Sequence, residues 1–69
     1  MKFDIYGRFV IELVREHDQW AIYRVGQGVR RREDGIALPP ELTPAEIAGM
    51  LDDFFHELAK PGDEIRRLD

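Results

Sequence analysis

The sequence predicts an α+β fold: a three- to four-stranded antiparallel sheet followed by one C-terminal amphipathic helix that packs on one face of the sheet. Two observations predict this class. Apolar and polar residues alternate through the first part of the chain, as in a half-buried strand. After a pair of prolines, apolar residues recur at helical spacing. Because 69 residues suffice for one small domain, we expect a single domain at residues 1–69, with the sheet at about 2–38, the helix at about 44–59 and a short tail at 61–69.

The first part of the sheet is expected to be a kinked strand followed by a hairpin. Apolar side chains fall on odd positions between Phe3 and Leu13, and Gly7 lies within this run, where a missing side chain favours a bend. The polar residues 16–19 separate this run from an aromatic and β-branched run at residues 20–25, which predicts a hairpin. With His17 and Asp18 at its tip, the hairpin places Arg15 opposite Trp20, Leu13 opposite Ile22 and Val14 opposite Ala21.

Glycine-rich turns divide the rest of the sheet. Gly26-Gln27-Gly28 predicts a turn, because glycine adopts positive φ without a steric clash. A third strand is expected from Val29 to Arg32, and residues 33–35 turn the chain again. Residues 36–38 form either a short fourth strand or an extended segment that ends at the two prolines.

The helix carries the clearest sequence signals. Thr43, Pro44 and Glu46 occupy the N-cap, N1 and N3 positions, which is the capping-box arrangement. Lys60-Pro61-Gly62 ends the helix, after which Ile65 and Leu68 are expected to pack beside the sheet. The predicted core combines one face of the first hairpin with the apolar stripe of the helix: Phe9, Ile11, Leu13, Trp20, Ile22, Ile47, Met50, Leu51, Phe54 and Leu58.

The composition argues against an enzyme. The chain has no serine and no cysteine, and Thr43 is better explained as a helix cap than as a nucleophile. Asp52 and His56, like Asp53 and Glu57, lie one helical turn apart, but two ligands do not make a metal site. His17 is expected to be a solvated turn residue rather than a general base. We therefore expect no catalytic residue, no metal and no cofactor.

The localisation expected from the sequence is cytoplasmic. The absence of cysteine fits a reducing compartment. Neither a signal peptide nor an apolar stretch of membrane-spanning length is recognisable, so no membrane partner is expected.

A partner protein is the leading functional hypothesis. One helix covers only one side of a small sheet, and large exposed apolar patches usually mark interfaces. The second side is predicted to carry an interface of six apolar residues: Tyr6, Val10, Val14, Ala21, Tyr23 and Val25. The partner is either a second copy, giving a homodimer, or another protein. The alternative is that a bulge at Gly7 exchanges the two faces and scatters these residues.

Nucleic-acid binding is the second hypothesis. The chain has a basic first half and an acidic second half, and its predicted contacts are Arg24, Arg30, Arg31 and Arg32, of which Arg24, Arg30 and Arg32 are expected to share one side. The overall net charge of −4 argues against it. The arginines also have two structural explanations: they prevent edge-to-edge pairing of sheets, or they pair with the protein's own acids.

Three segments resemble short bacterial proteins of unknown function, an uncharacterised family of about 70 residues. They are residues 2–9, the Trp20-x-x-Tyr23-Arg24-x-Gly26 segment, and residues 51–59 with Pro61-Gly62. The resemblance covers nearly the whole chain. It implies a stand-alone bacterial cytoplasmic protein, and it supplies no activity, ligand or catalytic residue.

Overall fold

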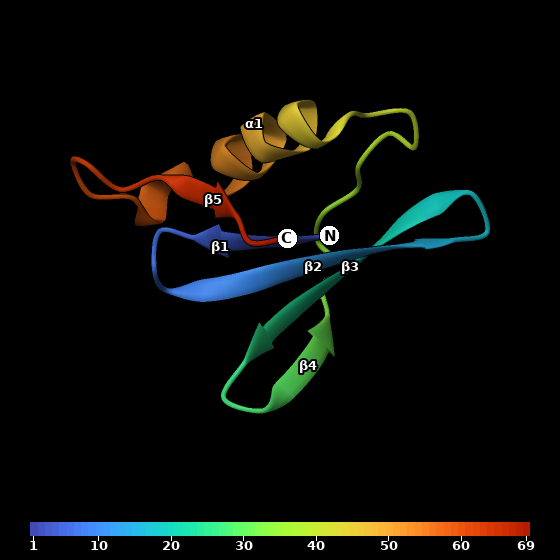
Figure 1. Ribbon diagram of the computed structural model, residues 1–69, viewed down its shortest axis with the longest axis horizontal. Coiled ribbons are helices and arrows are strands. Elements are labelled where there is room, and N and C mark those ends of the chain that lie inside the picture. The colour runs from blue at the N-terminus through green and yellow to red at the C-terminus, as the bar shows by residue number, and fades with distance from the viewer.

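Five antiparallel strands form one sheet in the computed structural model, which describes residues 1–69 (Figure 1). The strand order is β4-β3-β2-β1-β5, so β4 and β5 are the two edges. A helix lies across one face of the sheet, which confirms the α+β class; the strand count is five rather than three to four. The bounds are β1 Lys2–Ile5, β2 Phe9–Glu16, β3 Gln19–Gly26, β4 Val29–Arg32, α1 Pro44–Phe55, a 3-10 turn η1 His56–Leu58, and β5 Ile65–Arg67.

The predicted kinked strand is in fact a hairpin of β1 and β2. Tyr6 and Gly7 both have positive φ, 56° and 72°, and the N–H of Arg8 donates to the carbonyl of Ile5 at 2.9 Å. Gly7 therefore supplies a turn rather than a bend. Ile5 pairs with Phe9 across this turn, so the chain reverses direction while its apolar residues stay on one face.

The β2–β3 hairpin has the predicted register. Arg15 pairs with Trp20, and the pairs Leu13–Ile22 and Val14–Ala21 are also present. The tip is a two-residue turn in which His17 and Asp18 have φ of 51° and 62°. Positive φ at both central residues is the type I′ geometry, which matches the twist of the two strands.

The C-terminal tail adds the fifth strand. β5 pairs antiparallel with β1, with Ile65 opposite Ile5 and Arg67 opposite Phe3. Ile65 packs against the core as expected, whereas the side chain of Leu68 is 54% exposed. Residues 36–38 form no strand; they are the extended segment of the two alternatives, and Leu38 from this segment is buried.

The helix begins as predicted. The Thr43 hydroxyl accepts from the N–H of Glu46, and the Glu46 carboxylate accepts from the N–H of Thr43 at 3.0 Å, so the capping box is complete. The α-helix ends at Phe55 and a single 3-10 turn follows. Neither helical segment has the length and apolar character needed to cross a membrane.

The core lies between α1 and the sheet. Ile11, Leu13, Ile22, Ile47 and Leu51 are buried as predicted, and Phe9, Trp20 and Met50 pack against them partly exposed. The prediction was wrong for Phe54 and Leu58, which are 46% and 42% exposed. Successive helix residues turn by about 100°, so a stripe centred on Ile47, Leu51 and Phe55 leaves Phe54 on the flank, and Leu58 lies in the turn beyond α1. Four further residues of this core are absent from the predicted set: Phe3, Ile5, Tyr6 and Leu38. Ala21 is also buried, but on the opposite face of the sheet.

Candidate functional site

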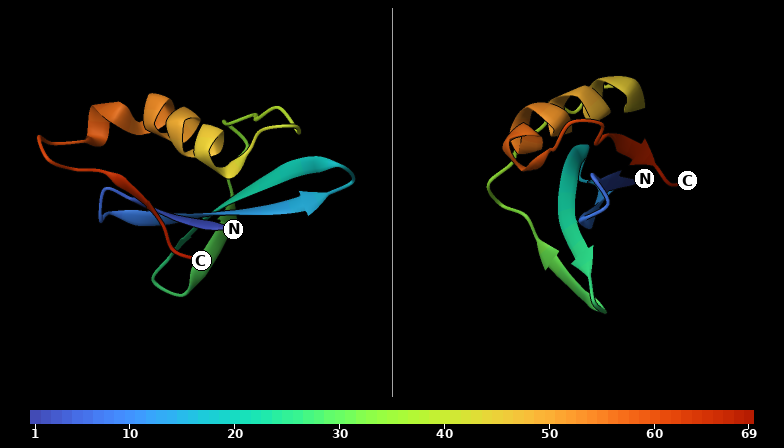
Figure 2. Two further views of the ribbon diagram at one scale, coloured as in Figure 1. Left: turned by 45° about the horizontal axis from the view of Figure 1, so that its top comes forward. Right: turned by 90° about the vertical axis from the view of Figure 1, so that its left-hand side faces the viewer.

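The face of the sheet opposite α1 carries no covering element (Figure 2). The strand registers assign to this uncovered sheet face the even-numbered residues of β2 and β4 and the odd-numbered residues of β3, because directly paired residues share a face. Its central members are Val10, Glu12, Val14, Glu16, Ala21, Tyr23, Val25, Arg30 and Arg32.

Five of the six predicted interface residues lie on the uncovered sheet face. Val10, Val14, Tyr23 and Val25 are half-buried. Ala21 is only 2% exposed, because its methyl group is shorter than the side chains around it. The face therefore offers a strip of four half-exposed apolar side chains rather than a patch of six.

Tyr6 was assigned wrongly to this face. It lies in the β1–β2 turn, is buried in the core beneath α1, and donates its hydroxyl proton to the Asp52 carboxylate. Burial, the hydrogen bond to Asp52 and the negative charge of Asp52, in this order of size, together raise the pKa of Tyr6 to about 12. Tyr6 therefore ties the turn to the helix and is not available to a partner.

Charged side chains surround and contact Tyr23 on the uncovered sheet face. The Arg30 guanidinium lies 3.7 Å from the centre of the Tyr23 ring, and that of Arg32 lies 5.8 Å from it. Arg30 pairs with Glu12 at 2.8 Å and Arg32 with Glu16 at 3.4 Å. The Tyr23 hydroxyl donates to Glu16 at 3.0 Å. These contacts hold the ring and four charged side chains in one arrangement across three strands.

The four predicted nucleic-acid contacts do not share one side. Arg24 pairs with Arg31 across β3 and β4, which places both on the helix side, whereas Arg30 and Arg32 lie on the uncovered sheet face. Across the two-residue turn at 27–28, an even-numbered residue of β3 faces an odd-numbered residue of β4, so Arg24 cannot share a face with Arg30. The expectation that Arg24, Arg30 and Arg32 form one basic side is wrong.

A basic hollow of about 330 Å³ lies on the helix side near the β3–β4 turn. Arg8, Arg24 and Arg31 line it together with Phe9 and Val29, and no acidic side chain is among its lining residues. Arg8 was missing from the predicted contacts. Nothing in the sequence pattern places it here, because it reaches the hollow only through the β1–β2 turn.

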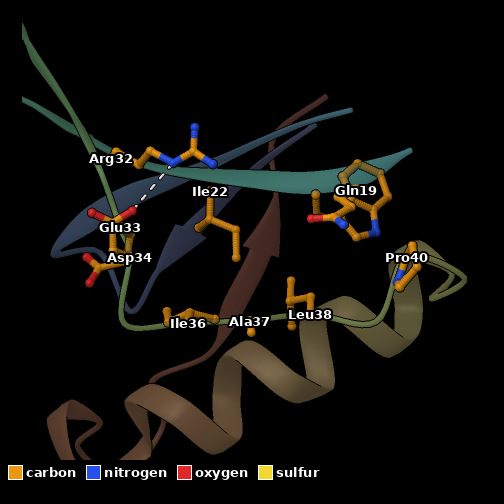
Figure 3. A pocket seen from close by; sticks show the side chains of 10 residues that line it. Gln19, Ile22, Arg32, Glu33, Asp34, Ile36, Ala37, Leu38 and Pro40 are labelled. Atoms are coloured by element: carbon orange, nitrogen blue, oxygen red, sulfur yellow. Dashed lines mark ion pairs between the residues drawn. The ribbon is translucent and has the colours of Figure 1, made fainter. Parts of the chain in front are cut away.

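A second hollow, of about 260 Å³, lies between β3 and the segment at residues 33–40 (Figure 3). Ile22, Ile36 and Leu38 form its apolar wall, and the Arg32–Asp34 ion pair of 3.4 Å lies at one end. The indole N–H of Trp20, which also contributes to the lining, is buried without an acceptor.

Asp52 and His56 of the helical segment make hydrogen bonds within the chain. Asp52 accepts from Tyr6, and His56 Nδ1 lies 2.8 Å from the carbonyl oxygen of Asp53, to which it donates. No group of three or more histidine, cysteine, aspartate or glutamate side chains is arranged to hold a metal ion.

Comparison with protein families gives one result. Residues 1–69 match the family model described as a domain of unknown function, DUF7661. The chain belongs to this family. The DUF7661 match spans both the sheet and the helix, and it fits the expectation of an uncharacterised family of about 70 residues. No match was found among curated proteins or among solved structures.

Proposed function

We propose that this DUF7661 domain is a non-enzymatic interaction module that binds a second copy of itself through the uncovered sheet face. One observation carries the proposal: the charges on this face are self-complementary about β3. Acidic residues lie on β2, at Glu12 and Glu16, and basic residues lie on β4, at Arg30 and Arg32. The half-exposed side chains of Tyr23 and Val25 lie between them on β3.

A two-fold contact makes use of this arrangement. The registers place Glu12, Tyr23 and Arg32 in one row across the sheet. If two sheets pack face to face about an axis parallel to β3, β2 of each copy lies over β4 of the other. Glu12 of each copy then lies over Arg32 of the other, and Tyr23 packs near its own counterpart. Such an isologous contact uses the same surface on both subunits.

Other ways of self-association are less favourable. An axis perpendicular to the strands would place β4 over β4 and bring arginines together, which costs free energy through like-charge repulsion. Pairing of two β4 edges has the same defect, because all four residues of β4 are exposed and three are arginines. The distribution of charge therefore selects one orientation.

A charge-swap experiment tests the proposal. The variants Arg30→Glu/Arg32→Glu and Glu12→Arg/Glu16→Arg each place like charges opposite each other in a homodimer. We expect both to be monomers in sedimentation equilibrium at concentrations where the natural chain is dimeric. In an equimolar mixture, the acidic face of one variant can pack against the basic face of the other, so we expect a heterodimer.

The control is Arg66→Glu/Arg67→Glu, which changes the same amount of charge at the other edge of the sheet, on β5. This control should dimerise like the natural chain. A natural chain that stays monomeric at millimolar concentration would overturn the proposal. So would dimers that persist in both charge-reversed variants.

Nucleic-acid binding through Arg24, Arg30, Arg31 and Arg32 has weaker support. It needs cations that lie on two opposite faces, and Arg30 and Arg32 are already paired with acids. A mobility shift at low salt that Arg30→Ala/Arg32→Ala removes would favour this function over self-association.

A further inference from the structure

We infer that the basic hollow formed by Arg8, Arg24 and Arg31 is a binding site for a phosphate group, either free or as a monoester of a small molecule. Arg24 and Arg31 lie on the helix side of the sheet, opposite the proposed dimer face, and Val25 is the one lining residue that also belongs to that face. The three arginines come from the β1–β2 turn, β3 and β4, and the fold brings them to one hollow.

The charge of the hollow is not balanced within the chain. Arg8 and Arg31 take part in no ion pair, although five other arginines and the N-terminal amine do. Arg24 is paired with Glu33 at 3.3 Å. After this one neutralisation, two positive charges remain, which equals the charge of a phosphate dianion.

Arg24 is held in place before any ligand binds. Its guanidinium lies 4.2 Å from the centre of the Phe9 ring and 5.7 Å from that of Phe55, and the two rings meet edge to face with centroids 5.2 Å apart. Stacking of this kind fixes the plane of the guanidinium and leaves N–H groups for an oxyanion. Arg24 can therefore orient the phosphate, while the exposed Arg8 and Arg31 close over it.

The size of the hollow favours a small ligand. A volume of about 330 Å³ lies at the lower end for small-molecule sites. A nucleic acid would need a longer row of unpaired cations, whereas the remaining arginines of β4 lie on the opposite face and are paired with glutamates. The hollow therefore fits one phosphate rather than a polyanion.

The test is a titration of the full chain, labelled with ¹⁵N, followed by two-dimensional NMR. Inorganic phosphate at neutral pH should shift the signals of Arg8, Gln27 and Arg31 in a saturable manner. Arg8→Gln and Arg31→Gln should each weaken binding by about fivefold, less than a buried charge-assisted bond would give, because both side chains are exposed. Arg66→Gln, an exposed arginine on β5, is the matched control and should bind like the natural chain.

Two further arms identify the source of the phosphate. Adenosine 5′-monophosphate that binds more tightly than inorganic phosphate, with adenosine inactive, would assign a phosphate monoester; equal binding would assign the free ion. Shifts that do not saturate, or that are unchanged in both glutamine variants, would show an adventitious ion only and overturn the inference. A short oligonucleotide that binds far more tightly and also shifts the guanidinium signals of Arg30 and Arg32 would overturn the small-ligand assignment. None of these outcomes depends on whether the chain dimerises.

Discussion

Replacing Tyr6 with phenylalanine should change how the stability of the protein depends on pH. The hydroxyl of Tyr6 is buried and donates to the Asp52 carboxylate, which is on the exposed side of α1. A hydrogen bond to a charged group contributes about 1.5–3 kcal/mol. Water can solvate Asp52 in the variant, so we expect the lower end, a loss of about 1.5 kcal/mol in the free energy of unfolding at pH 8.

The effect of Tyr6→Phe on the free energy of unfolding changes sign at high pH. The pKa of Tyr6 is raised from 10.0 to about 12 in the folded chain, so the unfolded chain loses this proton first. The stability that Tyr6 contributes is therefore complete below pH 10 and is lost as the pH rises toward 12. A rise of about two pKa units corresponds to a loss of roughly 1–2 kcal/mol at pH 11, and the loss grows as the pH rises toward 12. Tyr6→Phe should match the natural chain near pH 11 and be the more stable protein above it.

Urea denaturation between pH 8 and pH 11.5, followed by circular dichroism, measures this difference. Deprotonation of lysines changes the free energy of unfolding of both proteins by the same amount, so it does not alter the difference between them. Asp52→Asn provides a control: in that background the pH-dependent part of the Tyr6→Phe effect should shrink but persist, because burial is the largest cause of the raised pKa. A constant difference between natural chain and Tyr6→Phe across this range would refute the reasoning.

Three other substitutions test the fold by the same denaturation measurement. Thr43→Ala removes the capping oxygen and should lower the free energy of unfolding by about 1 kcal/mol. Thr43→Ser keeps a capping hydroxyl and should retain most of this stability. Leu51→Ala leaves a cavity in the core and should cost about 3 kcal/mol; Phe54→Ala should cost about 1 kcal/mol or less, and an equal loss at both would contradict the assigned core. Gln27→Asn should raise stability by about 0.5 kcal/mol, because asparagine tolerates the positive φ of this turn better; a decrease would argue against the turn geometry.

Local signals predicted the parts of the fold that depend on neighbouring residues. The capping box at Thr43 and Glu46 fixed the start of the helix, and the polar tip at His17 and Asp18 fixed the register of β2 and β3. Both are short-range arrangements in which side-chain chemistry decides the backbone geometry.

Long-range pairing was harder to predict. A continuous strand and the β1–β2 hairpin place Phe3, Ile5, Phe9 and Ile11 on the same face, because Ile5 pairs directly with Phe9. The alternation of apolar residues is therefore identical for both, and only Gly7 could have indicated the turn. β5 has three residues and one apolar side chain packed in the core, so no period of two can be recognised in it.

The candidate sites likewise contain parts that local sequence signals predict and parts that depend on long-range pairing. The members of the uncovered sheet face on β2 and β3 followed from the hairpin register. Tyr6 was misplaced because its side chain leaves the alternating pattern at a residue with positive φ. The basic hollow depends on Arg8, which only the β1–β2 turn brings toward β4, and a single sequence carries no signal for that approach.

The most direct test of self-association through the uncovered sheet face is an isotope-filtered NOE experiment on a mixture of labelled and unlabelled chains. Face-to-face packing about an axis parallel to β3 predicts intermolecular contacts from the Tyr23 ring to Tyr23 and Val25 of the second copy. Contacts confined to α1 or to the β4 edge, or none in a concentrated sample, would contradict it.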